Sequence, residues 1–376
     1  MLSDEQSLIR DTARAFARER LLPGAAARDL SGEIEPDILR EMGELGFLGM
    51  TIDPDHGGAG ADYVSYALAL MEIAAGDGAI STVMSVHNAP FNAILDRFGS
   101  AEQKKSVLRP AAAGAFIGAF ALTEAQAGSD ASALSCVARR SGKGYVIDGT
   151  KEFITSGKIG RYVIVFARME GTQGKAGITA FLVPTDTPGY QVARVEEKLG
   201  QRASDTCALR FEAMELPENA RIGDEGGGYR IALASLETGR IGIASQSVGM
   251  AQAALDMALA YARERKSFGT TLMGHQGVAF RLAALATELE AARQLVLHAA
   301  RMKDAGLPCL TEAAMAKLLA SETAERVVSG ALQCFGGYGY MRETGIERIY
   351  RDVRVCQIYE GTSDIQKLII ARALAG

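Results

Sequence analysis

The segment GKGYVIDGTKEFITSG (residues 142–157) decides the fold class of this chain. It is rich in β-branched and aromatic residues and punctuated by glycine, a composition typical of short strands and tight turns. Two similar runs follow it, RYVIVFA (161–167) and GITAFLVP (177–184). Together these runs predict an antiparallel β module over residues 119–220.

Helical patterns flank this module on both sides. YVSYALALMEIAAG (63–76) has helical spacing before it, and long helices are predicted after residue 221. Over residues 281–304 apolar side chains recur at intervals of three and four, the seam spacing of packed antiparallel helices, at Leu282, Leu285, Leu289, Ala292, Val296 and Ala299. The predicted fold is α+β and mainly α, with an N-terminal helical domain (1–118), a middle antiparallel β domain (119–220) and a C-terminal helical bundle (221–376).

The composition narrows the class of protein. The 376 residues are 48% hydrophobic and carry a net charge of −5 with a pI near 5.6, which argues against a nucleic-acid surface. The five cysteines show no pairing pattern and indicate reduced, buried thiols in a cytoplasmic protein. The charged N-terminus is unlike a signal peptide. The uncharged run 78–95 holds too many polar groups for a membrane span and predicts a buried helix and loop.

Several chemistries have no support in the sequence. No histidine is paired with a glutamate in the metalloprotease arrangement, and we predict no metal site; the histidines are His56, His87, His275 and His298. The sequence also has no phosphate-binding Walker loop, no nicotinamide fingerprint and no G-x-S-x-G nucleophile motif.

Four segments have residue patterns that could bind a ligand, and each also has a purely structural interpretation. ALTEAQAGSD (121–130) offers small residues and hydroxyls to a flat ring or a phosphate, or is a polar interdomain loop. KEFITSG (151–157) places Phe153 and Thr155 on one face of a strand, or Phe153 is a core residue. The glycines of QCFGGYGY (333–340) can expose N–H groups to a pyrophosphate, although a helix end explains one of them. The basic residues of RERKSFG (263–269) can neutralise phosphates or favour a helix C-terminus.

The segment YEGTSDIQ (359–366) places one carboxylate, Glu360, where two helical patterns meet. We expect the preceding helix to end at Gly361, and the next one to begin with a capping box of Ser363 and Gln366. An acid in such a turn is commonly only solvated or a cap. Its function therefore depends on the other motifs.

Taken in order, these segments resemble the acyl-CoA dehydrogenase family of flavoproteins. The resemblance covers nearly the whole chain and includes KLGQRASDT (198–206), GRIGIASQSVGMAQ (239–252) and the dipeptide HQ at 275–276. It implies a C-terminal four-helix bundle, one FAD per subunit and a homotetramer built as a dimer of dimers.

The resemblance also implies roles for individual residues. Glu360 matches the catalytic base. FAD would contact Phe120, Leu122, Thr123, Ser129, Phe153, Thr155, Thr362 and Asp364. Of these, Thr123, Phe153 and Thr155 would lie against the flavin, with Thr362 and Asp364 near it. The adenine-diphosphate end would be held, from a neighbouring subunit, by Arg265, Phe268, Gln276, Gln333, Gly336 and Gly337. The substrate would contact Ser129, Glu237, Arg240, Tyr359 and Gly361.

The implied reaction is an α,β-dehydrogenation of an acyl thioester to the trans-2-enoyl-CoA. A proton leaves the α-carbon for Glu360 while a hydride leaves the β-carbon for the flavin, and the backbone N–H of Glu360 would help to stabilise the enolate oxygen. The helix that follows would lower the pKa of Glu360 and burial would raise it; we expect burial to dominate once substrate excludes water.

Two positions depart from the family pattern. The family usually has tryptophan where this chain has Phe153, and the chain contains no tryptophan at all. Isovaleryl and long-chain members carry their base at the position of Gly239, before Arg240, so this chain does not resemble those subtypes.

The predicted substrate is a short or short branched-chain acyl-CoA, as in fatty acid metabolism or branched-chain amino acid catabolism, with electrons passed to an electron-transferring flavoprotein. A glutaryl-CoA-type dehydrogenase and a flavin acyl-CoA oxidase stay open as alternatives, and a non-catalytic acyl-CoA or flavin-binding protein is a distant third. We expect the cytoplasm as the location, or the mitochondrial matrix if the source is eukaryotic.

Overall fold

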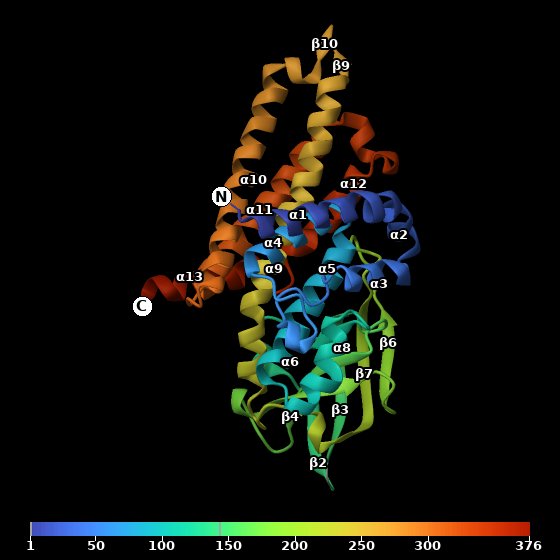
Figure 1. Ribbon diagram of the computed structural model, residues 1–376, viewed down its shortest axis with the longest axis vertical. Coiled ribbons are helices and arrows are strands. Elements are labelled where there is room, and N and C mark those ends of the chain that lie inside the picture. Colours follow the sequence, from blue (N-terminus) through green and yellow to red (C-terminus); the bar gives the residue numbers. More distant parts are fainter. Residues whose placement is uncertain (1, 143) are drawn as a thin grey trace.

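The computed structural model describes residues 2–142 and 144–376. Helices of the N-terminal region lie between a β-sheet at one end of the molecule and a long helical bundle at the other (Figure 1). This arrangement confirms the predicted order of helices, sheet and bundle. The domain boundaries at residues 118 and 220 stay predictions.

The N-terminal region is built around two buried helices. α4 (Tyr63–Gly76) packs between α1 (Asp4–Phe16) and α9 (Gly228–Glu264) of the C-terminal region, and α5 (Gly78–Val86) follows it directly. Smaller helices complete the region: α2 (Ala25–Ser31), α3 (Pro36–Glu44), α6 (Ala93–Phe98), α7 (Ala101–Gln103) and α8 (Arg109–Ala112). Residues 78–85 are all buried, as predicted for this uncharged run.

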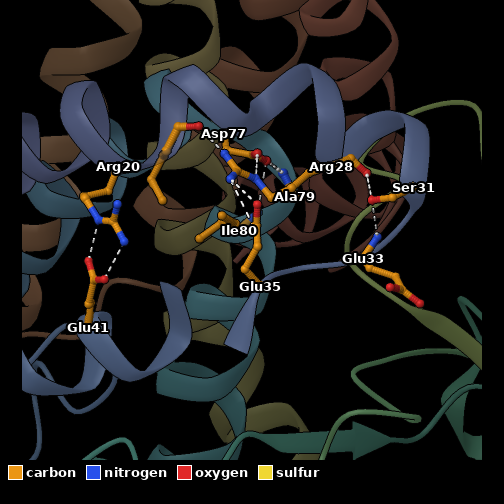
Figure 2. Close-up of polar contacts among 10 residues, drawn as sticks. Arg20, Arg28, Ser31, Glu33, Glu35, Glu41, Asp77, Ala79 and Ile80 are labelled. Atoms are coloured by element: carbon orange, nitrogen blue, oxygen red, sulfur yellow. Dashed lines mark hydrogen bonds and ion pairs between the residues drawn. The ribbon is translucent and has the colours of Figure 1, made fainter. Parts of the chain in front are cut away.

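The start of α5 is fixed by a buried ion pair. Asp77 accepts hydrogen bonds from the N–H of Ala79 (2.9 Å) and from Nε of Arg28 in α2 (2.8 Å), and Arg28 also reaches Glu35 (Figure 2). Removing either member of a buried pair leaves an uncompensated charge, which costs about 3–5 kcal/mol. This contact holds in place the helix that carries Thr82 and Ser85.

The middle region is one sheet in the order β6-β7-β3-β2-β4-β5-β8, with β1 also beside β4. Its strands are β1 (Gly118–Ala121), β2 (Val137–Ser141), β3 (Gly144–Thr155), β4 (Tyr162–Met169), β5 (Ile178–Pro184), β6 (Tyr190–Val195), β7 (Thr206–Pro217) and β8 (Arg221–Ile222). The pairing is antiparallel as predicted, except that β1 and β2 run parallel to β4.

The C-terminal region contains the predicted bundle. α9 (Gly228–Glu264), α10 (Gln276–Asp304) and α11 (Leu310–Cys334) pack against one another, and α13 (Ser363–Ala375) packs on α11. All six predicted seam residues of α10 are buried. A small hairpin of β9 (Lys266–Ser267) and β10 (Thr270–Thr271) joins α9 to α10, and α12 (Ile346–Val353) precedes α13. Within the described residues, no helix combines the length and apolarity needed to cross a bilayer.

Candidate active site

The turn that carries Glu360 lies between α12 and α13. α12 ends at Val353 and is followed by a 3₁₀ turn, so the helix does not continue to Gly361 as we expected. The predicted capping box is also wrong. Thr362 is the N-cap of α13 and accepts a hydrogen bond from the N–H of Ile365 (3.3 Å), while Ser363 is already the first helical residue.

Two consecutive residues of this turn have left-handed backbone conformations, Glu360 (φ 54°) and Gly361 (φ 86°). This conformation costs a non-glycine residue about 1–2 kcal/mol, so the surrounding structure must hold Glu360 in it. Gln366 donates from Nε2 to the carbonyl oxygens of Gly361 (2.8 Å) and Glu360 (3.2 Å). Lys317 of α11 donates to the same Gly361 oxygen (2.7 Å). These bonds fix the direction in which the Glu360 side chain leaves the turn.

The Glu360 carboxylate faces α9 at Gly239. A Cβ atom at position 239 would lie 2.6 Å from Oε2 of Glu360 and 3.0 Å from its Cδ, so no side chain fits there without displacing the carboxylate. Oε2 is buried and has no hydrogen-bond partner among the described residues. A second acid on α9, Glu237, is instead paired with Lys303 (2.8 Å). Glu360 therefore has the free carboxylate that a general base needs.

Burial raises the pKa of Glu360 to about 7, because the charged form loses its hydration. The positive charges of Arg240 and Lys317 act in the opposite direction and only partly offset it. Burial also lowers the pKa of Lys317 to about 8 and moves the pKa of Arg240 downward. We expected burial to dominate once substrate is bound, and it already does so in the chain alone. A base with this pKa exchanges protons readily near neutral pH.

Buried polar groups extend from this turn along α9. The hydroxyl of Tyr359 donates to Oε1 of Gln246, and Nε2 of Gln246 donates to Oγ1 of Thr82 (2.6 Å). One turn closer to Gly239, a Cβ at Gly242 would lie 2.6 Å from Oγ of Ser85 and 2.9 Å from the hydroxyl of Tyr66. Gly239, Gly242 and Gln246 follow the spacing of one helix face, so this face runs from the carboxylate to a closed polar network.

The middle domain brings together three residues predicted to contact the flavin. The N–H of Glu152 donates to the carbonyl of Thr123 (2.9 Å), which sets the loop after β1 beside the end of β3, where Phe153 and Thr155 lie. Phe153 is 64% exposed and has φ 60° in a bulge between Lys151 and Ile154. It is not a core residue. The simple alternation from which we placed it on the face of Thr155 is interrupted by this bulge.

A buried ion pair supports this loop. Nζ of Lys151 donates to Glu124 (2.7 Å) and to the carbonyl of Leu122 (3.0 Å), and both charged side chains are buried. Glu124 also accepts from the N–H groups of Ser135 (2.6 Å) and Cys136 (3.0 Å). The segment ALTEAQ is therefore rigidly anchored at its centre.

The other predicted residues of this loop differ in exposure. The Leu122 side chain is in the hydrophobic core, and Phe120 packs edge to face on Phe166 with ring centres 5.1 Å apart. Any contact of Leu122 with a ligand would therefore use its backbone. Ser129 is exposed, and a Cβ at the neighbouring Gly128 would meet no atom within 4 Å. On the turn of Glu360, Asp364 is also exposed.

The residues predicted to hold the adenine-diphosphate end gather at the far end of the bundle. Arg265 lies over the ring of Tyr338 at 5.9 Å, which joins the β9–β10 hairpin to the glycine-rich end of α11. Phe268, on the hairpin, is 99% exposed, and Cβ atoms at Gly336 and Gly337 would meet nothing within 4 Å. Gln276 begins α10 and Gln333 lies in the last turn of α11.

In Figure 1 this end of the molecule lies opposite the sheet, whose strand β3 carries Phe153 and Thr155 and whose strand β1 leads into the loop of Thr123. One chain therefore does not bring both predicted halves of the cofactor site together. The exposed ring of Phe153, the open glycine backbone and the exposed Phe268 fit the two ends of an FAD shared between two subunits.

A half-buried glutamate with a raised pKa and a buried, partner-free Oε2, together with surfaces elsewhere on the chain that fit a flavin, defines the class of site: a flavoprotein dehydrogenase that uses a carboxylate base. Comparison with known proteins gives the family. The chain matches the models of the acyl-CoA dehydrogenase N-terminal domain over residues 3–115, middle domain over 119–214 and C-terminal domain over 226–375. It belongs to the acyl-CoA dehydrogenase family, and it is a FAD-dependent oxidoreductase that acts on acyl-CoA.

Individual relatives cover the full chain. An acyl-CoA dehydrogenase of Bacillus subtilis is 43% identical over 375 residues, 100% of this chain and 99% of the relative. The short-chain specific acyl-CoA dehydrogenase of bovine (Bos taurus) mitochondria is 44% identical over 370 residues, 98% of this chain and 90% of the relative.

Solved structures agree closely with the fold. Butyryl-CoA dehydrogenase from Megasphaera elsdenii gives a TM-score of 0.98 at 37% identity, covering 100% of this chain and 99% of the other. A chain solved in work on the electron-transferring flavoprotein of Acidaminococcus fermentans gives 0.98 at 40% identity, with 100% and 98% coverage. A Mycobacterium smegmatis glutaryl-CoA dehydrogenase in complex with FADH2 gives 0.95 at 34% identity, with 100% and 95% coverage.

Sequence reasoning did not find the residues that support the site. Lys317 is the one charged residue in the run AAMAKLLA (313–320), which is a signal of a specific buried contact. The Glu124–Lys151 pair left no comparable signal, because both residues lie in polar segments. Gln366 was noticed, but as a capping residue and not as a donor to the turn.

Proposed function

We propose that this chain oxidises a short acyl-CoA at the C2–C3 bond, with Glu360 as the base that removes the C2 proton. The observation that carries this proposal is the Glu360 side chain, whose buried Oε2 faces α9 without a hydrogen-bond partner among the described residues. Bound FAD, held by the residues predicted to contact it, would supply the acceptor for the hydride of C3. The N–H of Glu360 donates to no group in the described structure and is available for the thioester oxygen.

The short chain length is supported by the helix face beyond Glu360. At Gly242 this face touches the hydroxyls of Tyr66 and Ser85, and at Gln246 it is closed by Thr82 and Tyr359. Such close polar packing leaves little length for an acyl chain. The short-chain specific relatives and the butyryl-CoA dehydrogenase structure support the same substrate class. The proposed substrates include short branched-chain acyl-CoA thioesters.

For the cofactor we propose the two sets of residues given above, the flavin set on one subunit and the adenine-diphosphate set on its neighbour. This division requires an oligomer, and the homotetramer is the form we propose. Arg240 and Glu237, on α9 next to Gly239, are proposed to contact the substrate together with Ser129, Tyr359 and Gly361.

For the electron acceptor we propose an electron-transferring flavoprotein. The support is the similarity to a chain solved in work on the electron-transferring flavoprotein of Acidaminococcus fermentans. Reoxidation of the reduced enzyme by air within seconds would instead indicate an oxidase. The relatives come from bacteria and from mitochondria, and we propose a cytoplasmic or mitochondrial-matrix location accordingly.

The test is anaerobic bleaching of the bound flavin by a panel of thioesters: butyryl-, isobutyryl-, 2-methylbutyryl-, glutaryl- and octanoyl-CoA. We expect butyryl-CoA or a short branched thioester to bleach fastest. Glu360→Gln should keep FAD and ligand binding but slow bleaching by about 10²–10⁴-fold, because the general base is lost. Glu41→Gln is the matched control, since its carboxylate is paired with Arg20 (2.7 Å from Nε) and has no role in the proposed site; it should bleach as the wild type does. Full bleaching by Glu360→Gln would refute the assignment.

A further inference from the structure

Lys317 is a fully buried lysine with an unusual set of contacts. It lies in α11, and none of its side chain is exposed. Burying an ammonium group is expensive unless the charge is compensated. Its Nζ makes one hydrogen bond within the described structure, to the carbonyl oxygen of Gly361 at 2.7 Å. The cost of burying this charge therefore points to a role at the turn of Glu360.

Holding the turn does not by itself require a charge. The Gly361 oxygen already accepts from the neutral amide of Gln366 at 2.8 Å. Elsewhere in the chain a buried lysine pairs directly with an acid, as Lys151 does with Glu124 at 2.7 Å. Lys317 instead contacts a carbonyl next to the acid, and leaves Oε2 of Glu360 without a hydrogen bond among the described residues. The arrangement supplies positive charge near the carboxylate without tying up the atom that must take a proton.

We propose that Lys317 is a positioning residue for the base: it fixes the Gly361 carbonyl of the left-handed turn that aims Glu360, and its charge favours the ionised carboxylate without pairing with it. This inference rests on the proposed function of Glu360.

The charged and titratable groups around Glu360 come from three helices and from its own turn. They are Lys317 on α11, Arg240 on α9 and Tyr66 on α4, with Cys356 and Tyr359 preceding the acid. The pKa is about 7 for Glu360 and about 8 for Lys317. An ionised Glu360 therefore lies beside a charged Lys317 only in a narrow pH interval between these two values. Loss of the lysine charge should therefore shift the acid side of the pH profile.

The test compares two variants that each remove one donor from the Gly361 carbonyl. Lys317→Met removes a donor and a charge, whereas Gln366→Met removes a donor only. The measurement is the rate of anaerobic flavin reduction by saturating butyryl-CoA as a function of pH. Lys317→Met should move the acid-side midpoint upward by about one unit, so that the rate below the midpoint falls about tenfold, with KM little changed. Gln366→Met should lower the rate at every pH and leave the midpoint in place. Lys317→Arg should return the midpoint toward that of the wild type.

An equal shift in both methionine variants, or no shift in Lys317→Met, would overturn the role of the charge. If Lys317→Met does not retain FAD, Lys317→Gln replaces it with the same expected shift. A readout without turnover separates this proposal from the function: the Glu360 carboxyl is titrated by infrared difference spectroscopy, with Glu360→Gln to assign the band. A higher Glu360 pKa in the Lys317 variant supports the inference even if no thioester bleaches the wild type, and an unchanged pKa refutes it.

Discussion

Gly239→Ala tests the placement of the base without touching an ionisable group. The new Cβ would lie 2.6 Å from Oε2, 3.0 Å from Cδ and 3.2 Å from Oε1 of Glu360. The carboxylate must retreat to restore ordinary contacts. Displacing a reacting group by about 1 Å costs about 10²-fold in rate, so flavin reduction by butyryl-CoA should slow by about 10–10²-fold. Alanine is also the better helix former by about 1 kcal/mol, which offsets strain in the fold.

The assay is single-turnover flavin reduction, with FAD content and thermal unfolding measured on the same samples. We expect full FAD content, an unfolding temperature close to that of the wild type and a lower rate at saturating substrate. A double-mutant cycle that combines Gly239→Ala with Glu360→Gln is decisive. Gly239→Ala should slow flavin reduction little further once the base is absent. An equal slowing in both backgrounds, or an undiminished rate in the single variant, would show that the Glu360 carboxylate does not work from the position facing Gly239.

Four more outcomes follow from the structure. The rate of flavin reduction should fall below about pH 7, where Glu360 is protonated, and this limb should be absent from the residual rate of Glu360→Gln. The FAD-free chain should lose stability as pH rises from 4.5 to about 7, because the folded state holds the Glu360 proton more tightly than the unfolded state does. Urea unfolding of the wild type and of Glu360→Gln over this pH range checks the direction of the change. Lys151→Met should destabilise the chain by about 3–5 kcal/mol in urea unfolding, and adding Glu124→Leu should recover part of it. Phe268→Ala should release FAD on dilution while the far-ultraviolet circular dichroism stays unchanged, because the ring is exposed on the single chain; retained flavin absorbance would contradict a cofactor role.

The sequence predicted those features that depend on local pattern. The α10 seam follows from periodicity and the β character of residues 144–155 from composition, and both were confirmed. Predictions from local pattern were wrong where tertiary contacts determine which of two neighbouring residues takes a structural role. Thr362 takes the cap in place of Ser363 because the preceding turn is set by Gln366 from beyond the cap. A bulge at Phe153 cannot be read from alternation, since it depends on the register of β3 against β7. Lys317 could be singled out as an unusual charge, but its acceptor lies 44 residues away along the chain.

The position of the β9–β10 hairpin and the glycine-rich end of α11, at the opposite end from the sheet, has a genetic consequence. Under the proposed division of the FAD site between subunits, two chains that are each inactive for a different reason should complement each other in a mixed assembly. A chain with Arg265→Ala keeps an intact flavin side, and a chain with Phe153→Ala keeps an intact adenine side. Where one chain of each kind forms a dimer, one of the shared FAD sites combines the intact flavin side of the first chain with the intact adenine side of the second. Co-expression of the two inactive alleles should thus restore part of the activity that neither has alone.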